Sequence, residues 1–115
     1  MKIIYLPILS IALSLTSIPL IANILTDLKI DSRYKIEVYA SDLESPRQLT
    51  ESPEGWIFVG SRNNGKIFAI RDTDGNGESD ERLLVAEGLK MSTGVSFFNG
   101  DLFFSEINKI WKIAN

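Results

Sequence analysis

The feature that most constrains this chain is an internal repeat of short apolar strands. The offset between matching segments falls from about 46 to about 43 residues along the chain, which is how a structural repeat with varying loops behaves. A period of about 45 residues with four short strands is typical of a β-propeller blade. In chain order, the matching segments are Val38–Leu49 with Val85–Val95, Gly55–Val59 with Gly100–Phe104, and Lys66–Ile70 with Lys109–Ile113.

Alternating polar and apolar residues between turn signals predict an all-β domain over residues 34–115, with no amphipathic helix. The expected strands are Tyr34–Tyr39, Arg47–Ser52, Trp56–Gly60, Lys66–Arg71, Arg82–Glu87, Thr93–Phe98, Asp101–Ser105 and Lys109–Ile113. The first of these would pair with the last blade of a closed ring. The others make about two blades of a β-propeller.

Two blades are fewer than a propeller ring needs, and one blade cannot bury both of its faces. We therefore expect the sequence to be the N-terminal part of a longer propeller protein. The alternative is a small complete two-blade protein, whose sheet edges would be exposed and prone to aggregation.

Residues 1–25 form an apolar leader. Lys2 precedes a run from Ile3 to Leu25 that is longer than the usual core of a secretory signal and has no clear cleavage site; cleavage after Ala22 is the nearest fit. A run of about 20 apolar residues is also long enough to anchor a protein in a membrane. The leader predicts export to the periplasm or the exterior, as a signal peptide or as an uncleaved anchor.

Charge and composition exclude several classes of function. The net charge is −3 and no basic stripe is present, which disfavours nucleic-acid binding. The sequence has no cysteine, so it forms no disulfide and no thiolate metal site. It also has no histidine, the commonest general base and metal ligand.

An acidic loop, residues 72–81, follows the expected strand Lys66–Arg71. Asp72, Asp74 and Asn76 stand at relative positions 1, 3 and 5, and Asp80 at position 9, as in the first part of a calcium-binding loop. Position 12 is Leu83, where an EF-hand needs a bidentate glutamate. The sequence leaves two interpretations open: a structural calcium site, and a turn whose side chains bind their own backbone.

Five residues are candidates to face the central channel of a propeller, where ligands usually bind. They lie on the innermost strands or at hairpin tips: Arg47, Gln48, Arg62, Thr93 and Glu106. The two arginines could hold carboxylates by bidentate pairing, or could pair with acidic neighbours at the surface. No nucleophile–base pair and no catalytic carboxylate pair can be assembled from these residues.

Trp56 and Trp111 stand at apolar positions of alternating strands. We expect both to lie in the core between blades, with a stacking platform for a ligand as the alternative.

Several short motifs, in order, resemble the glucose/sorbosone dehydrogenase family over residues 34–113. They are Lys35–Ala40, Pro46–Gln48, Ser52–Gly55, Phe58–Arg62, Gly65–Ile67, Arg71–Gly77, Glu87–Leu89 and Glu106–Asn108. The resemblance implies a six-bladed, exported propeller that oxidises a sugar or sugar aldehyde and passes electrons to a downstream acceptor. It also implies pyrroloquinoline quinone (PQQ) as hydride acceptor, held by calcium, with a histidine as general base and with arginine and lysine contacts to the cofactor.

None of the family's catalytic residues can be placed in this sequence, because they lie in later blades and the chain has no histidine. Where the family tends to have Pro-Asn-Gly-Val, this chain has Ser92–Val95. We therefore expect the fragment alone to be inactive. Two alternatives stay open: a non-catalytic propeller that binds a glycan or a protein, and a propeller hydrolase of the lactonase type with one catalytic metal.

Overall fold

The computed structural model describes residues 28–114. They belong to two units, and the first unit ends at Glu37 and the second begins at Val38. Residues 28–37 are exposed and contain one turn, which an ion pair of 2.9 Å between Arg33 Nε and Asp31 Oδ1 supports. The leader predicted at residues 1–25 lies outside the described residues. Residues 28–114 contain no helix, and therefore no helix that could cross a membrane.

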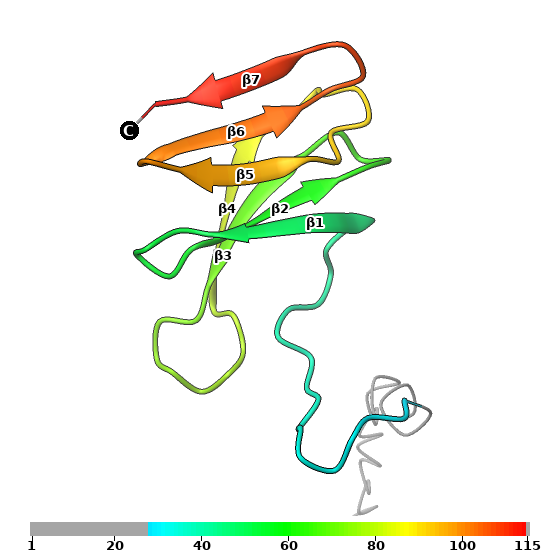
Figure 1. Ribbon diagram of the computed structural model, residues 1–115, viewed down its shortest axis with the longest axis vertical. Coiled ribbons are helices and arrows are strands. Elements are labelled where there is room, and N and C mark those ends of the chain that lie inside the picture. The colour runs from blue at the N-terminus through cyan, green and yellow to red at the C-terminus, as the bar shows by residue number, and fades with distance from the viewer. Residues whose placement is uncertain (1–27, 115) are drawn as a thin grey trace, which may run out of the picture. The chain divides into compact units, whose positions relative to one another are not determined.

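The rest of the described chain folds into two antiparallel sheets, which confirms the all-β prediction (Figure 1). The first sheet has the strand order β1-β2-β3-β4, and the second has the order β5-β6-β7. The strands are β1 Pro46–Glu51, β2 Ile57–Ser61, β3 Ile67–Arg71, β4 Glu81–Ala86, β5 Val95–Phe98, β6 Asp101–Ser105 and β7 Ile110–Ile113.

The strand expected at Tyr34–Tyr39 is wrong. These residues are in no strand, and no described strand pairs with them. The alternating pattern was present, but a half-buried strand also needs a neighbouring strand to bind its N–H and C=O groups. Pattern alone therefore gave a false strand at this point.

Turn residues set the hairpins. In the second sheet, Asn99 and Gly100 both have positive φ angles, 50° and 86°, as a tight two-residue hairpin between β5 and β6 requires. In the first sheet, Ser52–Trp56 connects β1 to β2 with a bond of 2.9 Å from the Ser52 N–H to the Trp56 carbonyl. The shorter connection in the second sheet accounts for part of the drift in the repeat offset.

Strand pairing keeps the same register in the two sheets. Ile57 pairs with Ile70 in the first sheet, as Leu102 pairs with Ile113 in the second. Across the preceding hairpin, Glu51 pairs with Ile57, as Phe97 pairs with Leu102. The matches found in the sequence are therefore equivalent positions in the fold.

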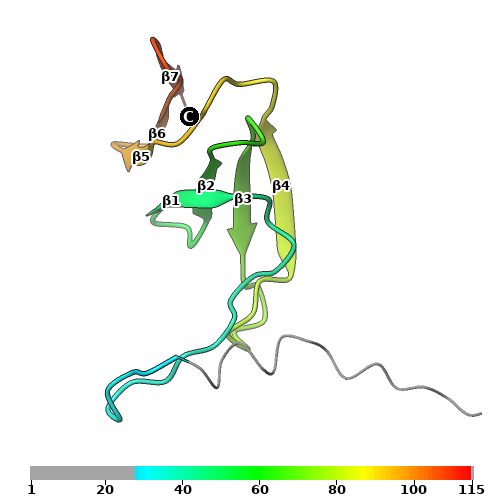
Figure 2. The same cartoon turned by 90° about the vertical axis from the view of Figure 1, so that its right-hand side faces the viewer.

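The two sheets pack through different faces. Ile67 of the first sheet packs with Val95, Leu102 and Phe104 of the second. The counterpart of Ile67 in the second sheet is Ile110, which pairs with Ser105 and so lies on the opposite face from Phe104. The packing is therefore head-to-tail, with one face of the first sheet against the other face of the second (Figure 2).

The core between the sheets is apolar and aromatic. Ile67 is completely buried, and Val95, Leu102 and Phe104 are at most 6% exposed. The rings of Phe58 and Phe97 stack across the interface, with centroids 5.8 Å apart and planes within 6°. This core holds the inner strands of the two sheets, and with them several of the candidate site residues, in fixed positions.

Candidate functional site

Gln48 and Thr93 lie where the two inner strands meet. The Gln48 Nε2 group donates to the Val95 carbonyl at 3.0 Å, and the Thr93 hydroxyl donates to the Met91 carbonyl at 3.4 Å. The Ser105 hydroxyl accepts a bond from the Gly94 N–H at 3.2 Å beside them. The structure therefore brings the two predicted residues onto adjacent elements, with their polar groups already engaged.

A second side chain of β1 also binds β5. The Thr50 hydroxyl accepts a bond from the Phe97 N–H at 3.1 Å. Thr50 and Gln48 thus bind the Phe97 N–H and the Val95 carbonyl, two backbone groups of β5 that do not bind β6. The strand pattern gave no signal for these bonds, because they depend on how one sheet is placed against the next.

Arg47 and Arg62 are exposed, and within residues 28–114 neither forms an ion pair. The Arg62 N–H donates to the Ser45 carbonyl at 3.3 Å, which ties the β2–β3 loop to the start of β1. The predicted pairing with acidic surface neighbours is therefore not found among the described residues, and the carboxylate-binding role stays a prediction.

Glu106 lies in a different hollow, of about 580 Å³, whose lining also includes Lys90, Lys109 and Trp111. Its carboxylate accepts bonds from the Lys90 N–H at 2.6 Å and from the Trp111 Nε1 group at 2.8 Å. These bonds, the Lys90 one first, lower the pKa of Glu106. A carboxylate held in this way is an acceptor and a poor proton donor near neutral pH.

Trp111 is 43% exposed, so the prediction that it lies in the core is wrong in this structure. Its ring lies under the Lys109 ammonium group, 5.5 Å from the ring centroid, while Glu106 binds its indole N–H. The Glu106–Lys109 hairpin loop brings these groups together, with a bond of 2.9 Å from the Glu106 N–H to the Lys109 carbonyl. Lys90 and Lys109 were not among the predicted site residues. Lys109 stands next to the predicted hairpin tip, whereas nothing in the local sequence connects Lys90 to it.

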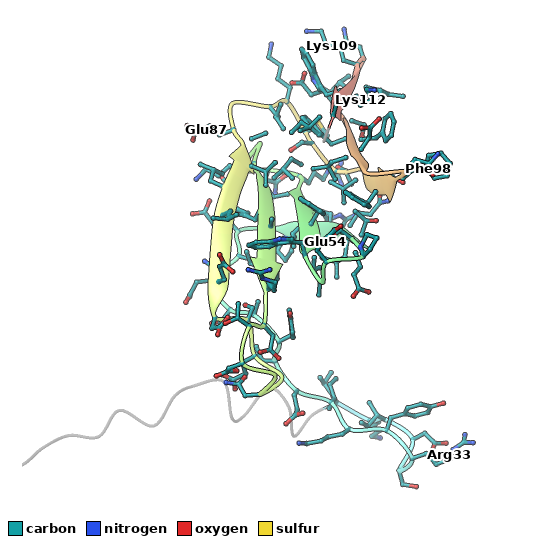
Figure 3. All side chains as sticks on the ribbon, turned by 90° about the vertical axis from the view of Figure 1, so that its left-hand side faces the viewer. Arg33, Glu54, Glu87, Phe98, Lys109 and Lys112 are labelled. Carbon is teal, nitrogen blue, oxygen red and sulfur yellow. The ribbon has the colours of Figure 1, made fainter. Side chains whose placement is uncertain are left out.

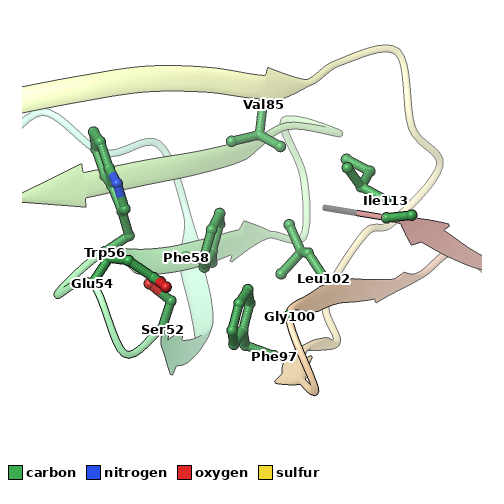
Figure 4. A pocket seen from close by; sticks show the side chains of 10 residues that line it. Ser52, Glu54, Trp56, Phe58, Val85, Phe97, Gly100, Leu102 and Ile113 are labelled. Carbon is green, nitrogen blue, oxygen red and sulfur yellow. The ribbon is translucent and has the colours of Figure 1, made fainter.

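Trp56 is half-buried and lies beside a groove of about 380 Å³ between the two sheets (Figure 4). The Arg71 guanidinium lies 4.3 Å from the centre of its ring and also binds Glu81, with Nε–Oε2 at 3.1 Å. Trp56 thus lines the groove between the sheets and is not among the residues of the buried core, where it was expected. The Ser52 hydroxyl, also in this groove, is buried and has no hydrogen-bond partner within residues 28–114.

The acidic loop between β3 and β4 gathers three of its four predicted ligands. Carboxylate oxygens of Asp72, Asp74 and Asp80 lie within 4.8 Å of one another. The Asn76 side chain instead binds within the loop, with Nδ2 donating to Asp74 at 3.1 Å and Oδ1 accepting from the Glu78 N–H at 2.8 Å. The cluster has the hard oxygen donors that calcium prefers.

The same carboxylates also bind the loop's own groups. Asp72 accepts N–H bonds from Gly77 at 2.9 Å and Gly75 at 2.7 Å, and these bonds lower its pKa. The Thr73 hydroxyl and N–H bind Asp80, at 2.6 and 2.9 Å, and lower the pKa of that group. The geometry is thus compatible with both interpretations of the loop, and the calcium site stays a prediction.

The five channel candidates do not converge on one site. Gln48 lines a groove of about 170 Å³ on the second sheet, Glu106 lines the hollow near Trp111, and the two arginines are exposed. In the described residues, no two of the five candidates bind each other through their side chains. The arrangement offers binding groups and no complete catalytic set.

No family model matches the chain, and no solved structure matches it significantly. An uncharacterized protein of Borreliella burgdorferi strain B31 is similar to it, with 26% identity over 113 residues. The match covers 96% of this chain and 28% of that protein, so the chain spans little more than a quarter of the relative's length. The similarity therefore shows that a much longer protein contains a related segment.

Proposed function

We propose that the two sheets are the first two blades of a β-propeller. The observation that carries this proposal is the head-to-tail packing of two sheets with equal register, in which Ile67 meets Phe104 and the counterpart of Ile67 is on the far face. A repeat that packs through two different faces can continue by the same rotation until a ring closes. The greater length of the similar protein leaves room for further blades.

We further propose that the complete protein is an exported PQQ-dependent dehydrogenase of the glucose/sorbosone type. Support comes from the ordered motifs of residues 34–113, several of which lie at turns and strand ends that position the inner strands. The leader at residues 1–25 agrees with an exported enzyme, in the periplasm or outside the cell. The substrate would be a sugar or sugar aldehyde, and a separate acceptor would receive the electrons.

The described residues do not themselves fit a bound quinone. PQQ carries several carboxylates and needs cationic or N–H donors, whereas the groove near Gln48 has no lysine or arginine in its lining. The sequence also has no histidine to remove a proton from a sugar hydroxyl. We therefore derive no catalytic step here and assign the cofactor site to later blades.

The complete reading frame that contains this chain tests the proposal. We expect about four further repeats, with a channel-facing histidine and nearby arginine and lysine residues. The purified protein should then reduce a dye with aldose sugars only when PQQ and calcium are supplied. Further blades without these residues would instead indicate a binding propeller, and converging Asp, Asn and Glu side chains in the channel would indicate a metal-dependent hydrolase.

A further inference from the structure

We propose that one face of the second sheet is the docking surface for a third sheet of the same repeat. This free face consists of alternate residues of β5, β6 and β7: Ser96, Phe98, Asp101, Phe103, Ser105, Ile110 and Lys112. Lys112 and Asp101 form an ion pair of 3.0 Å on it. The inference rests on the proposed propeller and identifies the contacts that would continue it.

The exposure of equivalent residues in the two sheets supports this inference. Ile67 of the first sheet is 0% exposed because the second sheet covers it, whereas its counterpart Ile110 on the free face is 79% exposed. Phe58 stacks on Phe97 across the interface, and its counterpart Phe103 has no such partner among the described residues. Phe98 projects from the end of the same face and is 64% exposed (Figure 3). Exposed apolar side chains that gather on a single face indicate an interaction site.

The free face is also hollowed where a neighbouring sheet would lie. Its groove of about 170 Å³ is lined by Phe103, Ser105 and Ile110, and by Gln48. Ser96 is the counterpart of Thr50, whose hydroxyl accepts a bond from the β5 backbone. The Ser96 hydroxyl is therefore placed to bind the innermost strand of a third sheet in the same way.

The occupant is a sheet from the remainder of the same protein. The interface already present is head-to-tail, so its continuation requires a sheet of the same repeat in the same orientation. This segment matches 28% of the length of the similar Borreliella burgdorferi protein, so a chain of that length has enough further residues to form another sheet. The alternative occupant of this surface is a second copy of the chain, and the experiment below distinguishes it from a third sheet of the same protein.

Thiol labelling of the full protein tests the docking surface directly. The sequence given has no cysteine, so Ile67→Cys, Ile110→Cys and Ile107→Cys each add one thiol to this segment, and the unmodified protein gives the background rate. Ile107 is a matched control, because it is 69% exposed on the β6–β7 turn and lies off the free face. We expect Ile110→Cys to label at least about tenfold more slowly than Ile107→Cys, as does Ile67→Cys, because a covered thiol reacts only through opening.

Labelling of Ile110→Cys as fast as Ile107→Cys would overturn the proposal. So would protection of Ile110→Cys that is lost on dilution, together with a dimeric mass, because that result means a second copy covers the face. The labelling rates do not depend on quinone or sugar. Labelling can therefore show that the free face is uncovered even if the protein is an active dehydrogenase. It can also show that the face is covered even if the protein has no dehydrogenase activity.

Discussion

The two sheets use the same pattern of residues, yet they bury different members of it. Leu49 is 61% exposed on the first sheet, while its counterpart Val95 on the second is 3% exposed. The opposite holds on the other face, where Ile67 is covered and Ile110 is not. Because the residue types are alike, the difference comes from which face has a neighbouring sheet. A neighbouring sheet is not the only cover, because Val59 and Ile70 lie on the same face as Leu49 and are at most 2% exposed. The strand sequence alone therefore does not determine which positions are buried.

The fourth strand makes a second difference between the sheets. Ile70 pairs with Arg82 of β4 and is 2% exposed, whereas its counterpart Ile113 lies on β7, an edge strand among the described residues, and is 40% exposed. An edge strand leaves backbone groups and apolar side chains open to solvent or to a partner. Among the described residues, the second sheet is therefore exposed both on its free face and at its outer edge.

The largest effect is expected at Ile67. Ile67→Ala should lower the free energy of unfolding by about 2–5 kcal/mol, because it leaves a cavity against Phe104 and Val95. Urea unfolding followed by circular dichroism measures the change, and Ile107→Ala on the exposed turn should cost less than about 0.5 kcal/mol. Equal effects of the two substitutions would mean that the two sheets do not pack as described.

Gly60 and its counterpart Ser105 give the next contrast. A Cβ atom at Gly60 would lie 2.6 Å from the Thr93 carbonyl oxygen, so Gly60→Ala must displace the segment that leads into β5. We expect a loss of about 1–3 kcal/mol on urea unfolding. Ser105→Ala removes only the bond from the Gly94 N–H and should cost about 1 kcal/mol. A neutral Gly60→Ala would contradict the close approach of the two sheets.

Much of the first sheet and of the repeat could be predicted from the sequence. Alternation and turn residues located all seven observed strands within two residues, and Asn99-Gly100 identified the tight hairpin between β5 and β6. The segments matched by sequence proved equivalent in strand register. These successes share a cause, since strand alternation and hairpin geometry are local properties that neighbouring residues determine.

The failures concern properties that are not local. Tyr34–Tyr39 has a strand pattern without a partner strand, and Trp111 has a core pattern but lies on β7, an edge strand among the described residues. The channel candidates Gln48 and Glu106 were grouped by topology, but the structure places them in separate hollows. In each case the deciding factor is a neighbour that the local sequence does not encode.

A smaller effect is expected at the contact between the inner strands. Thr50→Val removes the acceptor for the Phe97 N–H and should cost about 1 kcal/mol, whereas Thr50→Ser keeps the hydroxyl. Hydrogen exchange of the Phe97 amide, followed by NMR, should become faster in Thr50→Val and stay slow in Thr50→Ser. An unchanged exchange rate in Thr50→Val would show that the side chain does not link the two sheets.

The acidic loop should show the smallest effect on stability, and the second sheet has no counterpart of it among the described residues. Folding lowers the pKa of Asp72 and Asp80, so their contribution is present above the unfolded value of 3.8 and is lost as the pH falls through the folded pKa. Asp72→Asn should therefore flatten the acid side of a plot of thermal midpoint against pH.

The effect of calcium on the thermal midpoint tests whether the acidic loop binds the ion. If the loop binds the ion, calcium should raise the thermal midpoint of the unmodified protein at neutral pH and have less effect on Asp72→Asn. Asp101→Asn, a change to an acidic residue of the second sheet outside the loop, serves as the control. A midpoint that calcium leaves unchanged would mean that the loop is a turn held by its own hydrogen bonds.

An experimental structure of the complete protein tests the central claim, that the two sheets are successive members of one head-to-tail stack. We predict a third sheet on the free face, with an apolar residue against Ile110 and a backbone N–H that donates to the Ser96 hydroxyl, as the Phe97 N–H donates to Thr50. A second sheet with its free face in solvent, or two sheets that meet through equivalent faces, would contradict it.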